Sequence, residues 1–455
     1  MKPVTIDWSE WMKGESLADD APTGGFSPNS YGMNLTKARG LMYFSGSSTD
    51  RGGATLTGNI LASTYDKSFL GNDNYFLDDE GAFYYLDGNT LTKAQTVTAD
   101  TFILGTSDLI QFQGNTYATS QTRVIQLTGS DLTGVDSSWW TGLTTSYRHP
   151  MERVEDTLYI ADVNQIHTYD GTTSIAAAIS LPTDVNITSL RKHPDGINLI
   201  AFCGLTANFS HTRGLGGRIY LIDTRIKRWV REIDSVPQVE GSKVSGGVVY
   251  CTYGQNFGYF DGNAIQFMKR LSTSATTYSH NMADWDGILL VRDGINVLAL
   301  GDLGLGRRVW WKPLRNFTNS NSINCIAYKG SDKVLIAFAS GSAGALEETD
   351  MTEAGLGGKF YGNRTIMPVE CAMRRFEMLH TPVTGVYRFT VANKDETDTE
   401  STIYDTNPGS VSGVWSSKYR RELDLKSDQY QLSLSPSNGA PGFKFLRIFY
   451  DPIEQ

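Results

Sequence analysis

The carboxylates of this chain are the residues best suited to catalysis, and their positions argue against a catalytic pair. Glycoside hydrolysis needs two carboxylates set several ångströms apart in a cleft. Asp87, Asp170 and Asp261 each precede a glycine, and an aspartate at that position stabilises the backbone of a turn. We therefore interpret these three carboxylates as folding signals.

Metal-binding patterns are also missing from the sequence. The six histidines do not cluster. His149 stands near Glu152, and His193 precedes Pro194, but neither has a second ligand at the spacing of a zinc motif. The acidic loop at residues 393–400 offers carboxylates to Ca²⁺, yet its order does not match an EF-hand, so we interpret it as an exposed loop. We predict no metal site.

Glycine-rich stretches at residues 214–217 and 301–306 are candidates for phosphate binding. Neither leads into a helix whose N-terminus would hold an anion, so we interpret both as turns and predict no cofactor. Residues 48–53 share part of the sialidase box Ser-x-Asp-x-Gly-x-x-Trp, but they lack its tryptophan and its spacing. We predict no catalytic residue and expect that the protein is not an enzyme.

Two tryptophan pairs, Trp139-Trp140 and Trp310-Trp311, are candidates for contact with a sugar or a protein partner. Adjacent residues on a strand face opposite sides. Each pair is therefore expected to pack one ring inside the fold and to direct the other outward. Packing of both rings in the core or at a blade edge is the alternative.

The elements that carry these residues are predicted from a repeated hairpin. Stretches rich in β-branched and aromatic residues meet at tight turns about every 40 to 50 residues, which is the spacing of four-stranded propeller blades. The turns lie at Asp87-Gly88, Thr128-Gly129, Asp170-Gly171, Asp223, Asp261-Gly262 and Gly301-Asp302. We interpret the Asp-Gly turns as type I′, in which both central residues have positive φ.

The chain is predicted to be all-β and to divide into three parts. Residues 1–66 form an extended N-terminal arm that contributes to propeller closure and subunit contacts. Residues 67–355 form a β-propeller of about seven four-stranded blades, with the apolar runs at residues 198–202 and 334–338 as inner strands. Residues 356–455 have strands of a different spacing and are expected to form a β-sandwich.

Composition restricts the function classes. The 455 residues include 40 basic and 49 acidic residues, for a formal net charge of -9, which argues against general affinity for nucleic acid or anionic lipid. No apolar stretch is long enough for a membrane helix, and the N-terminus lacks the apolar core of a secretory signal. We expect that the protein is made in a cytoplasm and does not insert into a membrane. The four cysteines are far apart and are interpreted as buried thiols.

The N-terminal arm resembles the start of propeller-bearing structural proteins of tailed bacteriophages. The residues that carry the resemblance are the Gly-Gly and Pro pattern of residues 16–28, Tyr31-Gly32-Met33-Asn34 and Arg39-Gly40-Leu41-Met42. In layout the resemblance extends to the whole chain, because in that family an arm precedes a blade repeat and a β-rich domain closes the chain. The best-known nozzle proteins of the family are larger than this chain.

The resemblance implies a structural subunit of the virion tail, of the nozzle, hub or tip type, assembled in the host cytoplasm. Its partners would be other tail proteins and copies of itself, and genomic DNA would pass through a channel without sequence-specific contact. The alternatives are a host-surface glycan-binding protein, with Trp140 and Trp311 as contacts, and a polysaccharide-degrading propeller enzyme.

Overall fold

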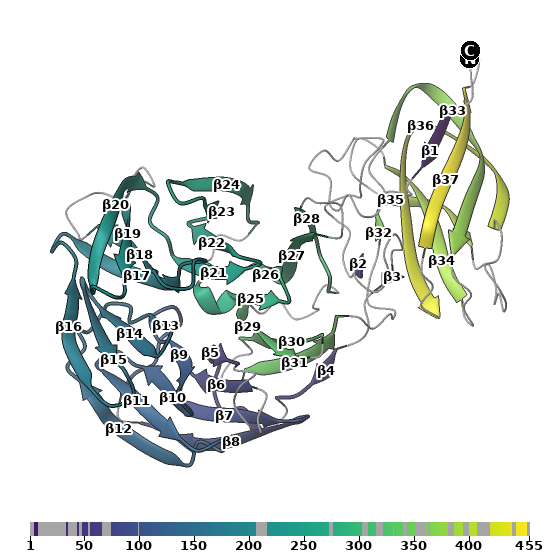
Figure 1. Ribbon diagram of the computed structural model, residues 1–455. Helices are drawn as coiled ribbons and strands as arrows, with labels where there is room; N and C mark the ends of the chain where they lie inside the picture. The colour runs from purple at the N-terminus through teal and green to yellow at the C-terminus, as the bar shows by residue number, and fades with distance from the viewer. Residues whose placement is uncertain are drawn as a thin grey trace. The chain divides into compact units, whose positions relative to one another are not determined.

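The structure is a computed structural model of residues 1–455. It describes residues 48–351 except 53–54, 66–73, 99, 206–215, 273–275, 303–307, 315–321, 331 and 340–343, and outside that range it describes mainly the backbone of several strands. The described part is all-β apart from short 3-10 turns such as η3 (Ser279–Asn281). Figure 1 shows a ring of small sheets and a second group of strands.

Seven four-stranded antiparallel sheets form a β-propeller, which confirms the predicted propeller and its predicted number of about seven blades. The first three blades, in chain order, are β5 (Ile60–Thr64), β6 (Asn74–Asp78), β7 (Ala82–Asp87) and β8 (Thr90–Thr96); β9 (Leu109–Phe112), β10 (Asn115–Thr119), β11 (Arg123–Thr128) and β12 (Gly134–Thr141); and β13 (Met151–Val154), β14 (Thr157–Asp162), β15 (Gln165–Tyr169) and β16 (Ser174–Ser180).

The remaining blades follow in the same manner. They are β17 (Val185–Lys192), β18 (Leu199–Leu205), β19 (Gly217–Asp223) and β20 (Arg228–Val236); β21 (Gly241–Ser245), β22 (Val248–Tyr253), β23 (Asn256–Phe260) and β24 (Ile265–Arg270); β25 (Met282–Trp285), β26 (Ile288–Asp293), β27 (Asn296–Asp302) and β28 (Arg308–Trp311); and β29 (Ile323–Gly330), β30 (Lys333–Phe338) and β31 (Ala345–Asp350), completed by β4 (Thr49–Asp50).

The first strand of each blade lies nearest the propeller axis. These seven strands contact one another in a closed cycle, from β5 through β9, β13, β17, β21 and β25 to β29 and back to β5. The apolar runs predicted as inner strands are the second strands β18 and β30, in the buried middle of their blades, as expected. They are apolar because neighbouring blades cover both of their faces, so distance from solvent, not nearness to the axis, determines their composition.

The hydrophobic core is divided into clusters between neighbouring blades. Tyr84 of the first blade and Leu335 of the seventh belong to one such cluster, and Tyr159 of the third and Tyr220 of the fourth belong to another. All four residues are at most 2% exposed. A fully buried aliphatic side chain contributes about 1.5–3 kcal/mol, so these interfaces supply most of the stability of the ring.

Three of the predicted buried thiols are described, and all three are confirmed. Cys203, Cys251 and Cys325 are buried and free. Burial raises the pKa of each thiol far above its usual range, so none of them is a reactive thiolate. Cys371 lies on β33, whose side chains are outside the described part.

The ring is closed by a strand from the N-terminal side of the chain. β4 pairs antiparallel with β31, with Asp50 opposite Glu347 and Thr49 opposite Glu348. Two backbone N–H groups that follow β4, those of Arg51 and Gly52, donate to the carbonyl of Leu346. The propeller sheets thus begin at β4 and β5, before residue 67.

Strands from both ends of the chain share a second sheet. Its order is β1 (Val4–Asp7), β37 (Phe443–Pro452), β33 (Thr365–His380), β36 (Tyr419–Asn438), β34 (Val386–Lys394) and β35 (Glu400–Thr406), with β32 (Phe360–Tyr361) also paired to β36. All of its pairings are antiparallel. The C-terminal strands occur where the sequence predicts them, while their packing as a sandwich stays a prediction. β2 (Met33–Asn34) and β3 (Tyr43–Phe44) form a separate pair.

The Asp-Gly hairpin turns occur as predicted, but they are not of type I′. Only the glycine of each turn has positive φ, at 57° for Gly88, 94° for Gly171 and 95° for Gly262. The carboxylates of Asp170 and Asp261 each accept two backbone N–H bonds within their four-residue loops. The aspartate side chain therefore organises the loop, and the residue after each glycine does not need a positive φ.

Candidate functional site

The first strands of all seven blades enclose a cavity of about 820 Å³, here called the axial cavity. One lining residue from each blade, in order, is Tyr65, Ile110, Glu152, Arg191, Lys243, Asp284 and Tyr328. The volume is within the range of roughly 300–1,000 Å³ that is usual for small-molecule sites. The axial cavity is therefore the strongest candidate for a ligand site in the described part of the propeller.

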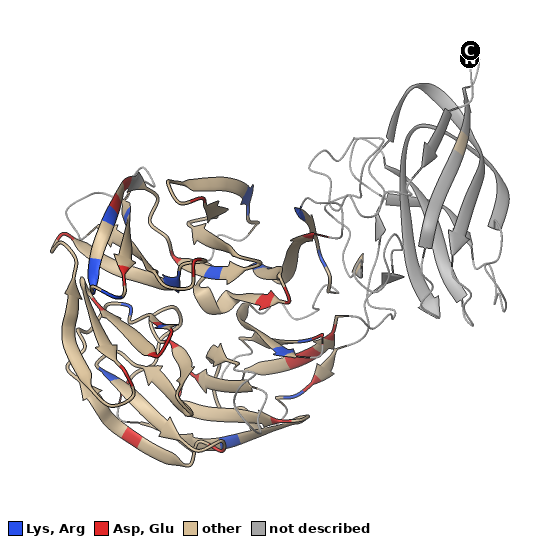
Figure 2. Cartoon of the chain, in the orientation of Figure 1, with Lys and Arg blue, Asp and Glu red and all other residues tan. Residues whose placement is uncertain are grey.

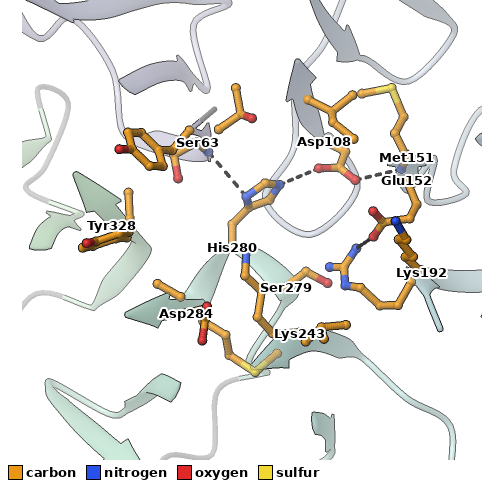
Figure 3. Close-up of a pocket in the computed structure, with 18 of the residues that line it drawn as sticks. Ser63, Asp108, Met151, Glu152, Lys192, Lys243, Ser279, His280, Asp284 and Tyr328 are labelled. Carbon is orange, nitrogen blue, oxygen red and sulfur yellow. Dashed lines mark hydrogen bonds and ion pairs between the residues drawn. The ribbon is translucent and has the colours of Figure 1, made fainter. Parts of the chain in front are cut away.

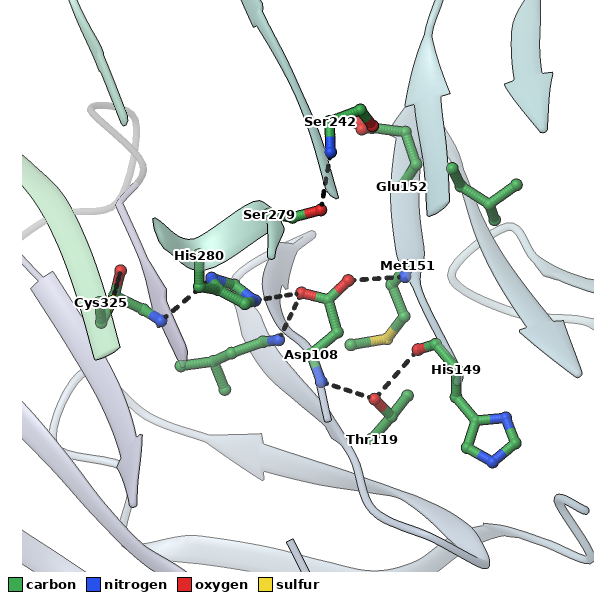
Figure 4. Close-up of polar contacts among 12 residues, drawn as sticks. Asp108, Thr119, His149, Met151, Glu152, Ser242, Ser279, His280 and Cys325 are labelled. Carbon is green, nitrogen blue, oxygen red and sulfur yellow. Dashed lines mark hydrogen bonds and ion pairs between the residues drawn. The ribbon is translucent and has the colours of Figure 1, made fainter. Parts of the chain in front are cut away.

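A histidine–aspartate pair connects four blades at one side of this cavity. Nε2 of His280 is 2.7 Å from Oδ1 of Asp108, and Nδ1 of His280 accepts the backbone N–H of Ser63. Oδ2 of Asp108 accepts the N–H of Met151. Figure 4 shows Asp108 at the centre of these contacts, with Thr119 and His149 continuing the network.

The protonation of this pair follows from its contacts. Because Nδ1 of His280 accepts a hydrogen bond, the ring proton is on Nε2 and is donated to Asp108. Burial alone would raise the pKa of Asp108, but the hydrogen bond from His280, together with the charge of Arg191 and the N–H of Met151, outweighs it and lowers that pKa. With both of its nitrogens engaged, His280 has no free site from which to act as a base, and the pair links blades together.

A second charged group lies on the third, fourth and fifth blades. Arg191 is 3.4 Å from Glu152, and its Nε donates to the carbonyl of Ser242 at 2.7 Å. Burial raises the pKa of Glu152, and the charge of Arg191 opposes that change. Figure 3 shows the labelled side chains of Glu152, Lys243, Asp284 and Tyr328 around the cavity.

The histidines named in the sequence analysis have structural positions. His149 is fully buried, with Nδ1 3.2 Å from the carbonyl of Ala161 and Nε2 3.3 Å from the carbonyl of Gln121. Burial lowers its pKa, and Asp162 opposes this. His193 is at the cavity wall but is paired with Asp195, 2.9 Å away. The structure does not bring His149 to Glu152, which is bound to Arg191 instead.

The first tryptophan pair does not follow the expected alternation of inward and outward rings. Trp139 packs edge-on against Tyr117 and Tyr169, each with ring centroids 4.9 Å away, while Trp140 lies 4.8 Å from the ring of His167. A β-bulge between β11 and β12 places several residues of β12 opposite Ile125, which breaks the alternation.

In the second pair, Trp311 is fully buried and Trp310 is half-buried. Trp311 is therefore wrong as a sugar contact. Trp140 is packed against His167, so the packing alternative describes the first pair better, while burial along β28 alternates as expected for the second pair.

Several other candidates are only partly described. The glycine-rich stretches at residues 214–217 and 301–306 lie mostly outside the described residues, as does the centre of the acidic loop at 393–400. Residues 49–50, within the sialidase-like stretch, form the closure strand β4. Among the residues that the structure describes, no group of three His, Cys, Asp or Glu side chains has the arrangement of a metal site. Over the same residues, no helix has the length and apolar character needed to cross a membrane.

The charged residues of the axial cavity were missed in the sequence. Asp108, Arg191, Lys243 and His280 lie on or next to first strands, which carry less continuous apolar sequence than second strands. The available signal was a charged residue shortly before the apolar run of each blade, as in Lys243 before residues 248–253.

Comparisons with known proteins identify no family for this chain. No family model matches the chain, and no curated protein matches it. Among solved structures, a streptogramin B lyase has 12% identity and a TM-score of 0.47, covering 68% of this chain and 97% of its own. The computationally designed Ika8 protein has 12% identity and a TM-score of 0.42, covering 68% and 87%. Hydrazine synthase of Kuenenia stuttgartiensis has 13% identity and a TM-score of 0.46, covering 64% and 95%. At these values no argument about function rests on them.

Proposed function

We propose that the chain is a structural subunit of a tailed-phage virion, an oligomeric tail component of the nozzle, hub or tip type. The observation that supports this most directly is the layout: a closed propeller lies in the chain between strands that join a second sheet. This layout accords with the resemblance of the N-terminal arm to tail proteins. A closed ring leaves few strand edges to mispair during assembly.

Exposed apolar side chains on outer strands support a role in protein contacts. Ile226, Val230 and Phe267 are 59%, 57% and 61% exposed, and Trp229 is 41% exposed. The last three lie on β20 and β24, the outer strands of the fourth and fifth blades. Large exposed apolar residues gathered on outer strands are typical of interaction surfaces.

Charge is consistent with this role. Figure 2 shows acidic and basic residues interspersed along the strands of the propeller. With a net charge of -9, such a surface does not favour general binding of DNA. In this proposal DNA passes through the centre of a ring of subunits and not along the axis of one propeller. Within the propeller, the hydrogen bond between Asp108 and His280 joins blades on opposite sides of that axis.

The test is the mass of the purified protein in solution together with its abundance in particles. Analytical ultracentrifugation is expected to show a ring-sized oligomer, alone or with a tail partner, and mass spectrometry of virions is expected to find the chain in multiples of six for a ring or in a few copies for a tip. Val230→Asp with Phe267→Asp should reduce assembly, whereas Asp170→Asn, on an exposed turn, should not. A strictly monomeric protein that is absent from virions would rule the proposal out.

A further inference from the structure

Lys243 places an unpartnered amine in the axial cavity. It lies on β21 and is half-buried, and its side-chain amine makes neither a hydrogen bond nor an ion pair with the residues that the structure describes. Burial lowers its pKa, the charge of Arg191 lowers it further, and Glu152, Asp284 and Asp108 oppose that change. Burying an ammonium group without a hydrogen-bond acceptor costs free energy. A ligand that supplies an acceptor to Lys243 would remove that cost.

Arg191 provides a second donor from the neighbouring blade. Its Nε bonds the carbonyl of Ser242, and its Nη1 bonds the carbonyl of Leu190 and approaches Glu152. Nη2 makes no hydrogen bond with the described residues. The protein contacts hold the guanidinium in place and leave one of its edges for an acceptor in the cavity.

The other residues that line the cavity determine which apolar groups and which net charge a ligand can have. Met282, Ile326 and the ring of Tyr328 line it together with the charged groups, which suits an apolar or aromatic body. Glu152 and Asp284 also face it, and their negative charge disfavours anions with more than one charge. The cavity thus combines two donors for an anion with acidic neighbours that limit its charge.

We propose that the axial cavity binds a small monocarboxylate with an apolar body, whose carboxylate accepts hydrogen bonds from Lys243 and from Arg191. This goes beyond the proposed tail role and does not depend on it. A bound ligand of this kind would contact strands of several blades at once and would stabilise the ring by mass action.

The experiment is isothermal titration of the full-length protein with three probes: phenylacetate, the neutral phenylacetamide and inorganic phosphate. Phenylacetate is expected to bind at least tenfold more tightly than phenylacetamide, and phosphate is expected not to compete with it. Lys243→Met, which keeps the length of the side chain and removes its charge, should weaken phenylacetate binding at least tenfold. Lys269→Met on the outer strand β24 is the matched control and should leave binding unchanged.

A thermal melt of each variant separates loss of the site from loss of the fold. If Lys243→Met melts like the native protein and binds phenylacetate equally well, the proposal is wrong. Absence of phenylacetate binding to the native protein at 20 mM would also overturn it, as would phosphate binding more tightly than phenylacetate. None of these outcomes bears on the oligomeric state, so failure here is distinct from failure of the tail proposal.

Discussion

At the scale of single residues, Glu348 is the most strongly constrained acidic side chain near the closure of the ring. Its carboxylate is 5% exposed and lies 2.6 Å from the amine of Lys329, 3.0 Å from Arg51 and 3.2 Å from Lys333. Burial alone would raise the pKa of Glu348, but the hydrogen bonds from Arg51 and Lys329 outweigh it and lower the pKa to about 2. Because three cations contact this buried carboxylate, closure of the ring depends on Glu348 being ionised.

We expect this cluster to give the propeller an acid-sensitive component of stability. The folded pKa of Glu348 is below the ordinary value of 4.5, so its contribution is complete above pH 4.5 and is lost as the pH falls towards about 2. The size should be about 3 kcal/mol. Urea unfolding measured between pH 6 and pH 3 should show about 2 kcal/mol of this loss in the native protein and none of it in Glu348→Gln.

The substitution also has an effect at neutral pH. Glu348→Gln leaves Lys329 buried without its counter-ion and should cost about 3–5 kcal/mol of unfolding free energy. Glu347→Gln, on the same strand but with a half-exposed side chain, is the control and should retain the acid dependence. Equal acid dependence in both variants would contradict the assignment.

At the scale of elements, the closure strand β4 is short, and its pairing depends on a few backbone hydrogen bonds. The N–H of Arg51 donates to the carbonyl of Leu346 at 2.8 Å, and its guanidinium binds Glu348 from the same position. Gly52 follows, where an added Cβ would lie 2.6 Å from the side chain of Leu56 and 3.0 Å from the backbone of Leu346. The backbone hydrogen bond and the ion pair of Arg51 and the close packing of Gly52 therefore occur at the same turn.

Arg51→Pro should open the seventh blade. It removes both the N–H donor and the ion pair, whereas Arg51→Ala removes only the ion pair, so the proline variant should be the less stable of the two by about 1–3 kcal/mol. Hydrogen exchange should become faster in β31 and β30 of the proline variant. The idea fails if exchange in β31 is the same in the two variants.

At the scale of the whole chain, the two ends meet in one sheet while the propeller closes on itself. β1 pairs with β37, with Val4 opposite Tyr450 and Asp7 opposite Arg447. Independently, β4 closes the ring by pairing with β31. The N-terminal segment that the sequence analysis treats as a single arm therefore supplies strands to two different sheets.

Deletion of residues 1–8 should affect these two sheets differently. Loss of β1 exposes the edge of β37, so hydrogen exchange at residues 443–452 should become faster. Exchange in β6, β18 and β30 should not change, because their hydrogen bonds lie within separate sheets. Faster exchange throughout the propeller would show that β1 is also needed to hold the ring.

The sequence by itself determined the all-β class, the blade number and most turns, because these depend on local chemistry. Asp170 and Asp261 bind the backbone of their own loops, and the second strands β18 and β30 carry long apolar runs. Such features can be predicted from the sequence of a few neighbouring residues.

Only the tertiary structure decided which charged residues meet. Asp108 and His280 are separated by 172 positions, as Glu348 and Arg51 are by 297, yet each pair is in contact. The ring brings together residues at the same place in different blades, and nothing in the local sequence of one blade specifies the side chain that the next blade presents. The axial cavity, and Lys243 within it, exist only because the circle of sheets closes.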